Sequence, residues 1–100
     1  MKKLKVGGHW YTIRVKKLPA SQNDLAQCDY NKATITIDRK IIVKSIRESA
    51  FIHEFIHACN STFGNDGIEH GLLDSLAEQI YQVLKDNNLL NQKQVDFYLE

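Results

Sequence analysis

The chain has 100 residues and a formal net charge of +1, with 43% hydrophobic and 25% charged residues. This length favours a single domain over residues 1–100, and the composition is that of a globular protein. The near-neutral charge, with no basic run beyond Lys2-Lys3 and Lys16-Lys17, predicts no nucleic-acid partner. No apolar stretch has membrane-spanning length and the N-terminus lacks the apolar segment of a signal peptide, so no membrane partner and a cytoplasmic location are expected.

The first half of the chain has the patterns of β-strands. Residues 2–6 and 9–17 alternate apolar and polar side chains around two glycines, which predicts a hairpin with one buried face. Residues 28–30 and 33–38 predict a second hairpin. Two widely separated cysteines without CxxC spacing are expected to be free thiols in a reducing compartment.

The second half of the chain predicts helices. Ser45 and Glu48 have capping-box spacing, so a helix is expected to begin there, and Asp66 with Glu69 indicates a second helix start. Each helix carries one apolar stripe at helical spacing. The stripes are Ile52, Phe55, Ile56, Cys59 and Phe63, then Leu73, Leu76, Ala77, Ile80 and Leu84. With a short C-terminal helix capped by Asn91, the expected fold is α+β, a small twisted sheet of three to four strands packed on two long helices.

The segment HEFIH, residues 53–57, contains the candidate chemistry. On a helix, His53 and His57 lie on one face one turn apart, so both imidazoles can reach one zinc ion. Glu54 points about 100° around the helix, where its carboxylate can act as general base without binding the metal. This arrangement suits hydrolysis by a metal-activated water.

The third metal ligand is expected from the second helix. The longer pattern HExxHxxGxxH is excluded, because Asn60 and Phe63 occupy the positions that require Gly and His. His70 and Asp74 border the second apolar stripe, so they can face the first helix if the stripes pack together. We expect His70 to be the third ligand and Asp74 to orient a ligand imidazole. Glu69 is the alternative ligand, although a helix-capping role is favoured for it.

The motif HEFIH, followed by IEHGLLDSLAEQIYQVLKDN, resembles small phage and prophage zincin-like metallopeptidases. More distantly, it is similar to the gluzincin clan, including ImmA/IrrE-type peptidases and minigluzincins. The resemblance implies a small twisted sheet packed on the motif helix and a third ligand from the second helix. That ligand is usually Glu, and here its position falls on His70. The resemblance also implies that an extended peptide lies beside an edge strand of the sheet, for which Ala33–Asp38 is the candidate.

The motif therefore predicts a zinc metallopeptidase that acts on a protein or peptide, and the resemblance implies that it is encoded by a phage or its bacterial host. The alternative is a catalytically silent, zinc-stabilised protein-binding module of phage or prophage origin. A purely structural metal site has no use for a general base, so Glu54 favours the enzyme. A metal-free helical interaction protein is the third hypothesis, which metal content would separate from the other two.

Overall fold

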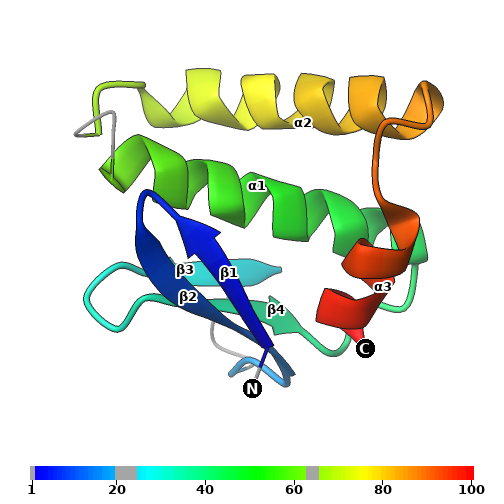
Figure 1. Cartoon of the computed structure of the whole chain (residues 1–100), viewed down its shortest axis with the longest axis horizontal. Helices are drawn as coiled ribbons and strands as arrows, with labels where there is room; N and C mark the ends of the chain where they lie inside the picture. Colours follow the sequence, from blue (N-terminus) through cyan, green and yellow to red (C-terminus); the bar gives the residue numbers. More distant parts are fainter. Residues whose placement is uncertain (1, 20–24, 63–65) are drawn as a thin grey trace.

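Four strands precede three helices in the computed structural model, which describes residues 2–19, 25–62 and 66–100 (Figure 1). The strands are β1 (Lys2–Val6), β2 (His9–Lys16), β3 (Ala26–Asp29) and β4 (Thr34–Asp38). The helices are α1 (Lys44–Thr62), α2 (His70–Asp86) and α3 (Gln92–Leu99). The predicted α+β class and the number of elements are confirmed.

The strands form one mixed sheet with the order β1-β2-β4-β3. Both predicted hairpins are present, because β1 pairs with β2 and β3 with β4, each antiparallel. Gly7 and Gly8 have φ values of 59° and 82°, which a glycine-glycine turn allows without strain. The two hairpins are joined by parallel pairing of β2 with β4.

The position of β4 corrects one expectation about substrate docking. Residues 33–38 were expected to form an edge strand, but β4 lies between β2 and β3. Its backbone groups therefore form hydrogen bonds with neighbouring strands on both sides. Among the described strands, β1 and β3 are the edges, and β3 is the one that contacts α1 more extensively.

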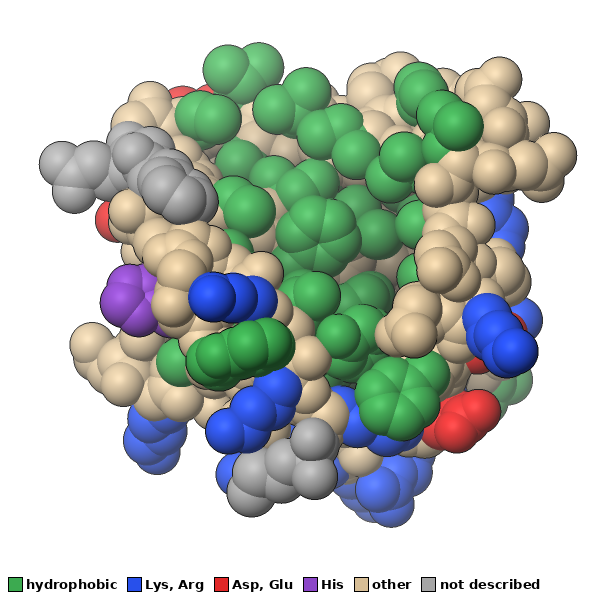
Figure 2. All heavy atoms as spheres, viewed as in Figure 1, with side chains coloured by type: hydrophobic (Ala, Val, Ile, Leu, Met, Phe, Trp, Pro, Cys, Tyr) green, Lys and Arg blue, Asp and Glu red, His purple; other side chains and the backbone are tan. Residues whose placement is uncertain are grey.

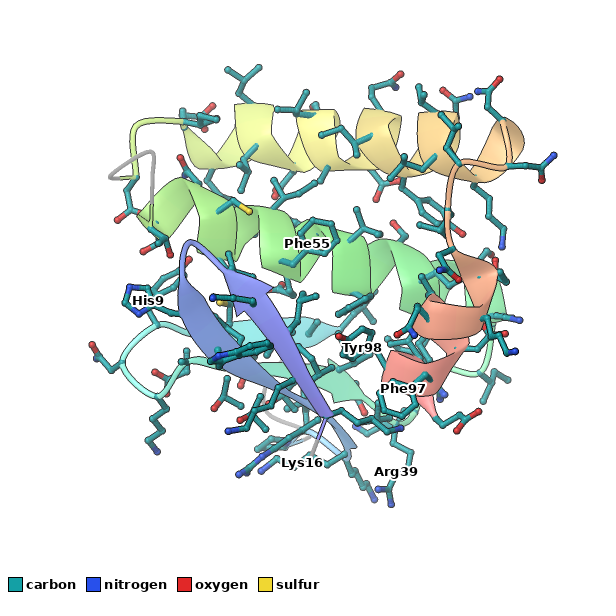
Figure 3. All side chains as sticks on the ribbon, in the orientation of Figure 1. His9, Lys16, Arg39, Phe55, Phe97 and Tyr98 are labelled. Atoms are coloured by element: carbon teal, nitrogen blue, oxygen red, sulfur yellow. The ribbon has the colours of Figure 1, made fainter. Side chains whose placement is uncertain are left out.

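The main core lies between the sheet and α1, with α2 on the far side of α1 (Figure 1). Ile35 and Ile37 of β4 have no exposed surface, and Phe51 of α1 is 3% exposed against them. The C-terminal helix α3 closes one end of this layer with Val95 and Leu99. Phe55 and Tyr98 point into the same interior region (Figure 3). Within the described residues, no helix is both long and apolar enough to cross a membrane.

The two predicted capping boxes are wrong. Helix α1 begins at Lys44, so Ser45 is already inside it, and the Glu48 side chain is fully buried against other helices. Asp66 precedes α2 with φ of 57°, and the N-cap of that helix is Glu69 itself. In contrast, the Asn91 side chain caps α3 as expected, by accepting a hydrogen bond from Gln94 N–H.

Candidate metal centre

The motif residues His53, Glu54 and His57 lie in helix α1, which is fixed in place by buried residues before and after them. Ile52 is 2% exposed and Ala58 is fully buried, so the rotation of α1 about its axis is fixed by packing on both sides of the motif. The His53 and His57 rings lie 4.7 Å apart between centroids. This is the stacking that an i, i+4 pair on a regular helix produces.

The connection between α1 and α2 is held by Asn60. This buried side chain donates to the backbone C=O of Ile68 and accepts from its N–H, both at 3.1 Å. The backbone C=O of Asn60 also accepts from Asp66 N–H at 2.9 Å. Asn60 therefore sets where α2 begins relative to the end of α1, and with it the positions of His70 and Asp74.

Glu69 acts as the cap of α2. Its two carboxylate oxygens accept hydrogen bonds from Gly71 N–H at 2.7 Å and Leu72 N–H at 3.0 Å. These bonds hold the pKa of this carboxyl below its usual range. Since both oxygens are used for capping, the structure gives Glu69 the helix-start role that was favoured for it.

Three potential ligand atoms converge between α1 and α2. His53 Nε2 lies 2.5 Å from Asp74 Oδ1 and 2.9 Å from His57 Nε2, and His57 Nε2 lies 3.5 Å from the same oxygen. His53, His57 and Asp74 form a group whose ligand atoms all lie within 4.8 Å of one another. Two imidazole nitrogens and one carboxylate oxygen are a donor set that suits zinc.

His70 lies beside this group. Its Nε2 is 3.3 Å from the second carboxylate oxygen of Asp74, and its ring is 5.0 Å from that of His57. The His70 side chain is 74% exposed, compared with 29% for His53 and 14% for His57. Asp74 thus bridges His70 on one oxygen and the motif histidines on the other.

The protonation states suit metal binding. Burial, together with the nearby His53 and His70, lowers the pKa of His57, and Asp74 only partly opposes this. The pKa of Asp74 is raised by burial but lowered more by its hydrogen bond and charge interaction with His53, so it lies below the usual value. At neutral pH the cluster therefore offers a neutral imidazole and an ionised carboxylate, the forms that coordinate metals.

An open hollow of about 760 Å³ lies between this cluster and the edge strand β3. It is lined by residues 26–31 and by His53, Glu54, His57, His70 and Asp74. Cys28 in this wall is a free thiol whose pKa is raised to about 12, by burial and then by the Glu54 carboxylate. Glu54 lines the same hollow as Cys28, so its negative charge contributes to this shift.

A second hollow of about 480 Å³ continues along the same strand and shares Ala26, His53 and Glu54 with the first. Its other walls combine apolar and hydroxyl side chains with one exposed carboxylate: Leu25, Ser45, Ile46, Ser49, Ala50, Glu78 and Tyr81. The two hollows form a groove beside β3, with the candidate metal ligands near one end.

Two tyrosine hydroxyls lie near the hollows and differ in whether they are already hydrogen-bonded within the described residues. Tyr30 lines the first hollow, whereas the Tyr81 hydroxyl donates to Glu48 at 2.9 Å and is used in that contact. The C-terminal tail does not cover the cluster, because α3 packs on the core and the Tyr98 hydroxyl donates to Lys3 C=O. His9, at the start of β2, is exposed and points outward from the sheet (Figure 3).

Sequence reasoning missed the role of Asn60 and the close approach of Asp74 to both motif histidines. No signal in the motif identified Asn60, because its contact depends on the length of the connection to α2.

No family model matches this chain, and neither a curated protein nor a solved structure is detectably similar to it.

Proposed function

We propose that this chain is a zinc-dependent metallopeptidase of zincin-like architecture, with Glu54 as general base. The observation that carries the proposal is the convergence of His53 and His57 on Asp74, with Glu54 in the same hollow. A structural zinc site is normally closed by four protein ligands, whereas a catalytic site has three and an open position. Three ligands beside an open groove fit the catalytic type.

Asp74 is the proposed third ligand, in place of the expected His70. Its Oδ1 lies within 3.5 Å of both motif nitrogens, whereas His70 Nε2 lies 3.3 Å from the other oxygen of this carboxylate. In the proposed site His70 orients Asp74, a role that matters because ligating carboxylates are usually held by a second hydrogen bond. The alternative, with His70 as ligand and Asp74 as its orienting partner, uses the same four residues and is separated by single substitutions.

Glu54 is proposed to act on the attacking water. A bound zinc ion supplies a lowered water pKa and polarises the scissile carbonyl. Glu54 accepts the proton of that water and transfers it to the leaving amine. Glu54 lines the same hollow as the three proposed ligands, and this is where its carboxylate is proposed to act.

The substrate is proposed to be an extended segment of a protein or peptide. β3 is an edge of the described sheet and borders both hollows, so a peptide can pair with its backbone and pass the metal ligands. The partly apolar walls of the second hollow suit a hydrophobic side chain of the substrate.

The direct test is zinc-dependent cleavage of a mixture of denatured proteins, read by mass spectrometry as new N-termini. Wild type loaded with zinc should produce them, and Glu54→Gln should retain zinc but lose cleavage by at least about 100-fold. Asp86→Asn, an exposed charge-removing control on α2, should cleave as wild type does. Zinc binding without cleavage by wild type would favour the silent binding module, and equal cleavage by Glu54→Gln would remove the assigned base.

A further inference from the structure

The charges of this chain are divided between its two halves. Residues 1–40 contain nine of the 13 Lys and Arg residues but only three of the 12 Asp and Glu residues. A net charge of +1 conceals this division, and the expectation of no nucleic-acid partner rested on that net value. Figure 2 shows the basic side chains mostly over the strands, in the lower half of the view.

One face of the sheet is left open by the helices. Ile13, Ile35 and Ile37 point to the face that packs on α1, so the alternate residues point to the opposite face. Strand register sets these alternate residues side by side across the sheet: Lys3 with Thr12, Lys5 with Trp10, Thr12 with Thr34, Arg14 with Thr36, and Gln27 with Thr36. Lys16 and Arg39 point away from the helices at this side of the molecule (Figure 3).

The open face is hollowed and basic. A concavity of about 670 Å³ is lined by Arg14, Lys16, Lys17 and Lys32, with three threonines between them and Asp29 as its one acidic residue. All four cations are exposed, and none forms an ion pair within the described residues. One carboxylate oxygen of Asp29 already accepts a hydrogen bond from Lys32 N–H. The hollow therefore presents unneutralised positive charge, which matches phosphate oxygens.

An exposed aromatic ring extends this basic hollow along β2. Trp10 is the only tryptophan of the chain, is 57% exposed and points to the open face, with Lys5 Nζ 5.5 Å from its ring centroid. From Trp10 to Lys16 the strand spans about 20 Å, at roughly 3.3 Å per residue. A cationic track with an exposed ring at one end is the combination that single-stranded nucleic acid uses, with phosphates on the cations and a base stacked on the ring.

We propose that the open sheet face binds single-stranded nucleic acid through Arg14, Lys16, Lys17 and Lys32, with base stacking on Trp10. Double-stranded partners fit less well, because their bases are stacked internally and none of the three helices in the described part of the chain projects from that face to enter a groove. An acidic protein segment would satisfy the cations but has no planar group for the exposed ring. The basic hollow shares Gln27 and Asp29 of β3 with the hollow of the candidate metal centre, but its four cations do not line that hollow, so the proposal does not depend on peptidase activity.

The test is a titration of the full-length chain with oligothymidylate and oligouridylate. Trp10 fluorescence should be quenched on stacking, and labelled oligonucleotide should show a saturable rise in anisotropy. Four neutralised phosphates predict a slope of about −3 for log affinity against log salt. Lack of binding by both oligonucleotides at low salt would overturn the proposal.

Three variants make the test specific for this face. Arg14→Glu with Lys16→Glu should weaken binding by at least about tenfold, whereas Lys93→Glu, an exposed reversal on α3, should change it less than about twofold. Trp10→Ala should weaken binding by about tenfold or more while leaving the salt slope unchanged. An equal loss with Lys93→Glu, equally tight binding of polyglutamate or duplex DNA, or binding without Trp10 quenching would each contradict the proposal.

Discussion

The Nε2 atom of His53 lies 2.5 Å from Oδ1 of Asp74, a residue 21 positions later on the neighbouring helix. This contact makes the candidate metal centre a property of the α1–α2 interface and not of the HEFIH motif alone. A metal ion held by both helices would link them in the folded state and not in the unfolded chain. Zinc binding should therefore raise the stability of the fold.

The first prediction separates the two candidates for the third ligand. Asp74→Ala should lower zinc affinity by more than about 100-fold, because it removes an oxygen that faces both motif histidines. His70→Ala should lower it by roughly tenfold, the size expected for a residue that orients a ligand. Competition with a chromogenic chelator measures both, and His9→Ala is the control for loss of an exposed histidine. A larger loss with His70→Ala would exchange the two roles.

The second prediction concerns Asn60 as the residue that positions α2. Asn60→Ala removes two hydrogen bonds to Ile68 and should lower the free energy of unfolding by about 1–3 kcal/mol. It should also weaken zinc binding, since Asp74 would lose its fixed position relative to α1. Asn91→Ala, which removes the cap of α3, should cost about 1 kcal/mol without changing zinc affinity. Equal zinc affinities in these two variants would show that Asn60 does not position the site.

The third prediction concerns the buried carboxylate of Glu48, which joins all three helices. It accepts hydrogen bonds from Tyr81 and Lys85 at 2.9 Å each, and from Gln92. Glu48→Gln should lower the free energy of unfolding at neutral pH by roughly 2 kcal/mol, because the three buried hydrogen-bond donors then lose their charged acceptor. Chemical denaturation measures this, and the exposed Asp86→Asn should change stability by less than about 0.5 kcal/mol.

The same carboxylate gives the fold an acid-sensitive contribution. Burial raises the pKa of Glu48, but its hydrogen bonds lower it more, so the folded pKa lies below the ordinary value of 4.5. The ionised form is favoured by folding, so this contribution is present above pH 4.5 and is lost as pH falls through the folded pKa. The stability difference between wild type and Glu48→Gln should shrink below pH 4.5. A difference that stays constant through this range would contradict the assignment.

The fourth prediction concerns the raised pKa of the Tyr81 hydroxyl. Burial and the hydrogen bond to Glu48 raise the pKa of Tyr81 to about 12 from an ordinary value of 10.0. Folding favours its neutral form, so the contribution is full below pH 10 and is lost as pH rises towards 12. An ultraviolet titration should contain a phase near pH 12 that is absent in Tyr81→Phe and retained in Tyr98→Phe. Persistence of that phase in Tyr81→Phe would refute the assignment.

Local patterns predicted the elements of this fold but not all of their pairings. Alternation along residues 9–17 depends on neighbours in sequence and agrees with the observed burial. The predicted stripe of α1 agrees less well, because Ile52 is buried but Phe55, Ile56 and Cys59 are half-buried, and Phe63 lies outside the described residues. The parallel pairing of β2 with β4 depends on a long connection, so β4 was expected at an edge although it is interior. The Ser45 capping box failed because partners on α2 and α3 compete for the Glu48 carboxylate.

The candidate site was predictable in its residues and less so in their arrangement. Motif spacing brought His53 and His57 together, and the border of the second stripe selected His70 and Asp74. These two residues differ by only about 40° around α2, so their relative reach depends on the packing of that helix on α1. That packing depends on Asn60, whose contact no local pattern indicated, and on the capping of α2 at Glu69, for which the sequence favoured a capping role.

The zinc content of freshly purified wild-type protein, measured by elemental analysis beside a His53→Ala, His57→Ala double variant, tests the central claim most directly. The account predicts one zinc per wild-type chain, removed by the double substitution, with a lower unfolding temperature after chelation. No zinc in wild type, and none taken up when zinc is added, would contradict the metal centre and with it the proposed peptidase.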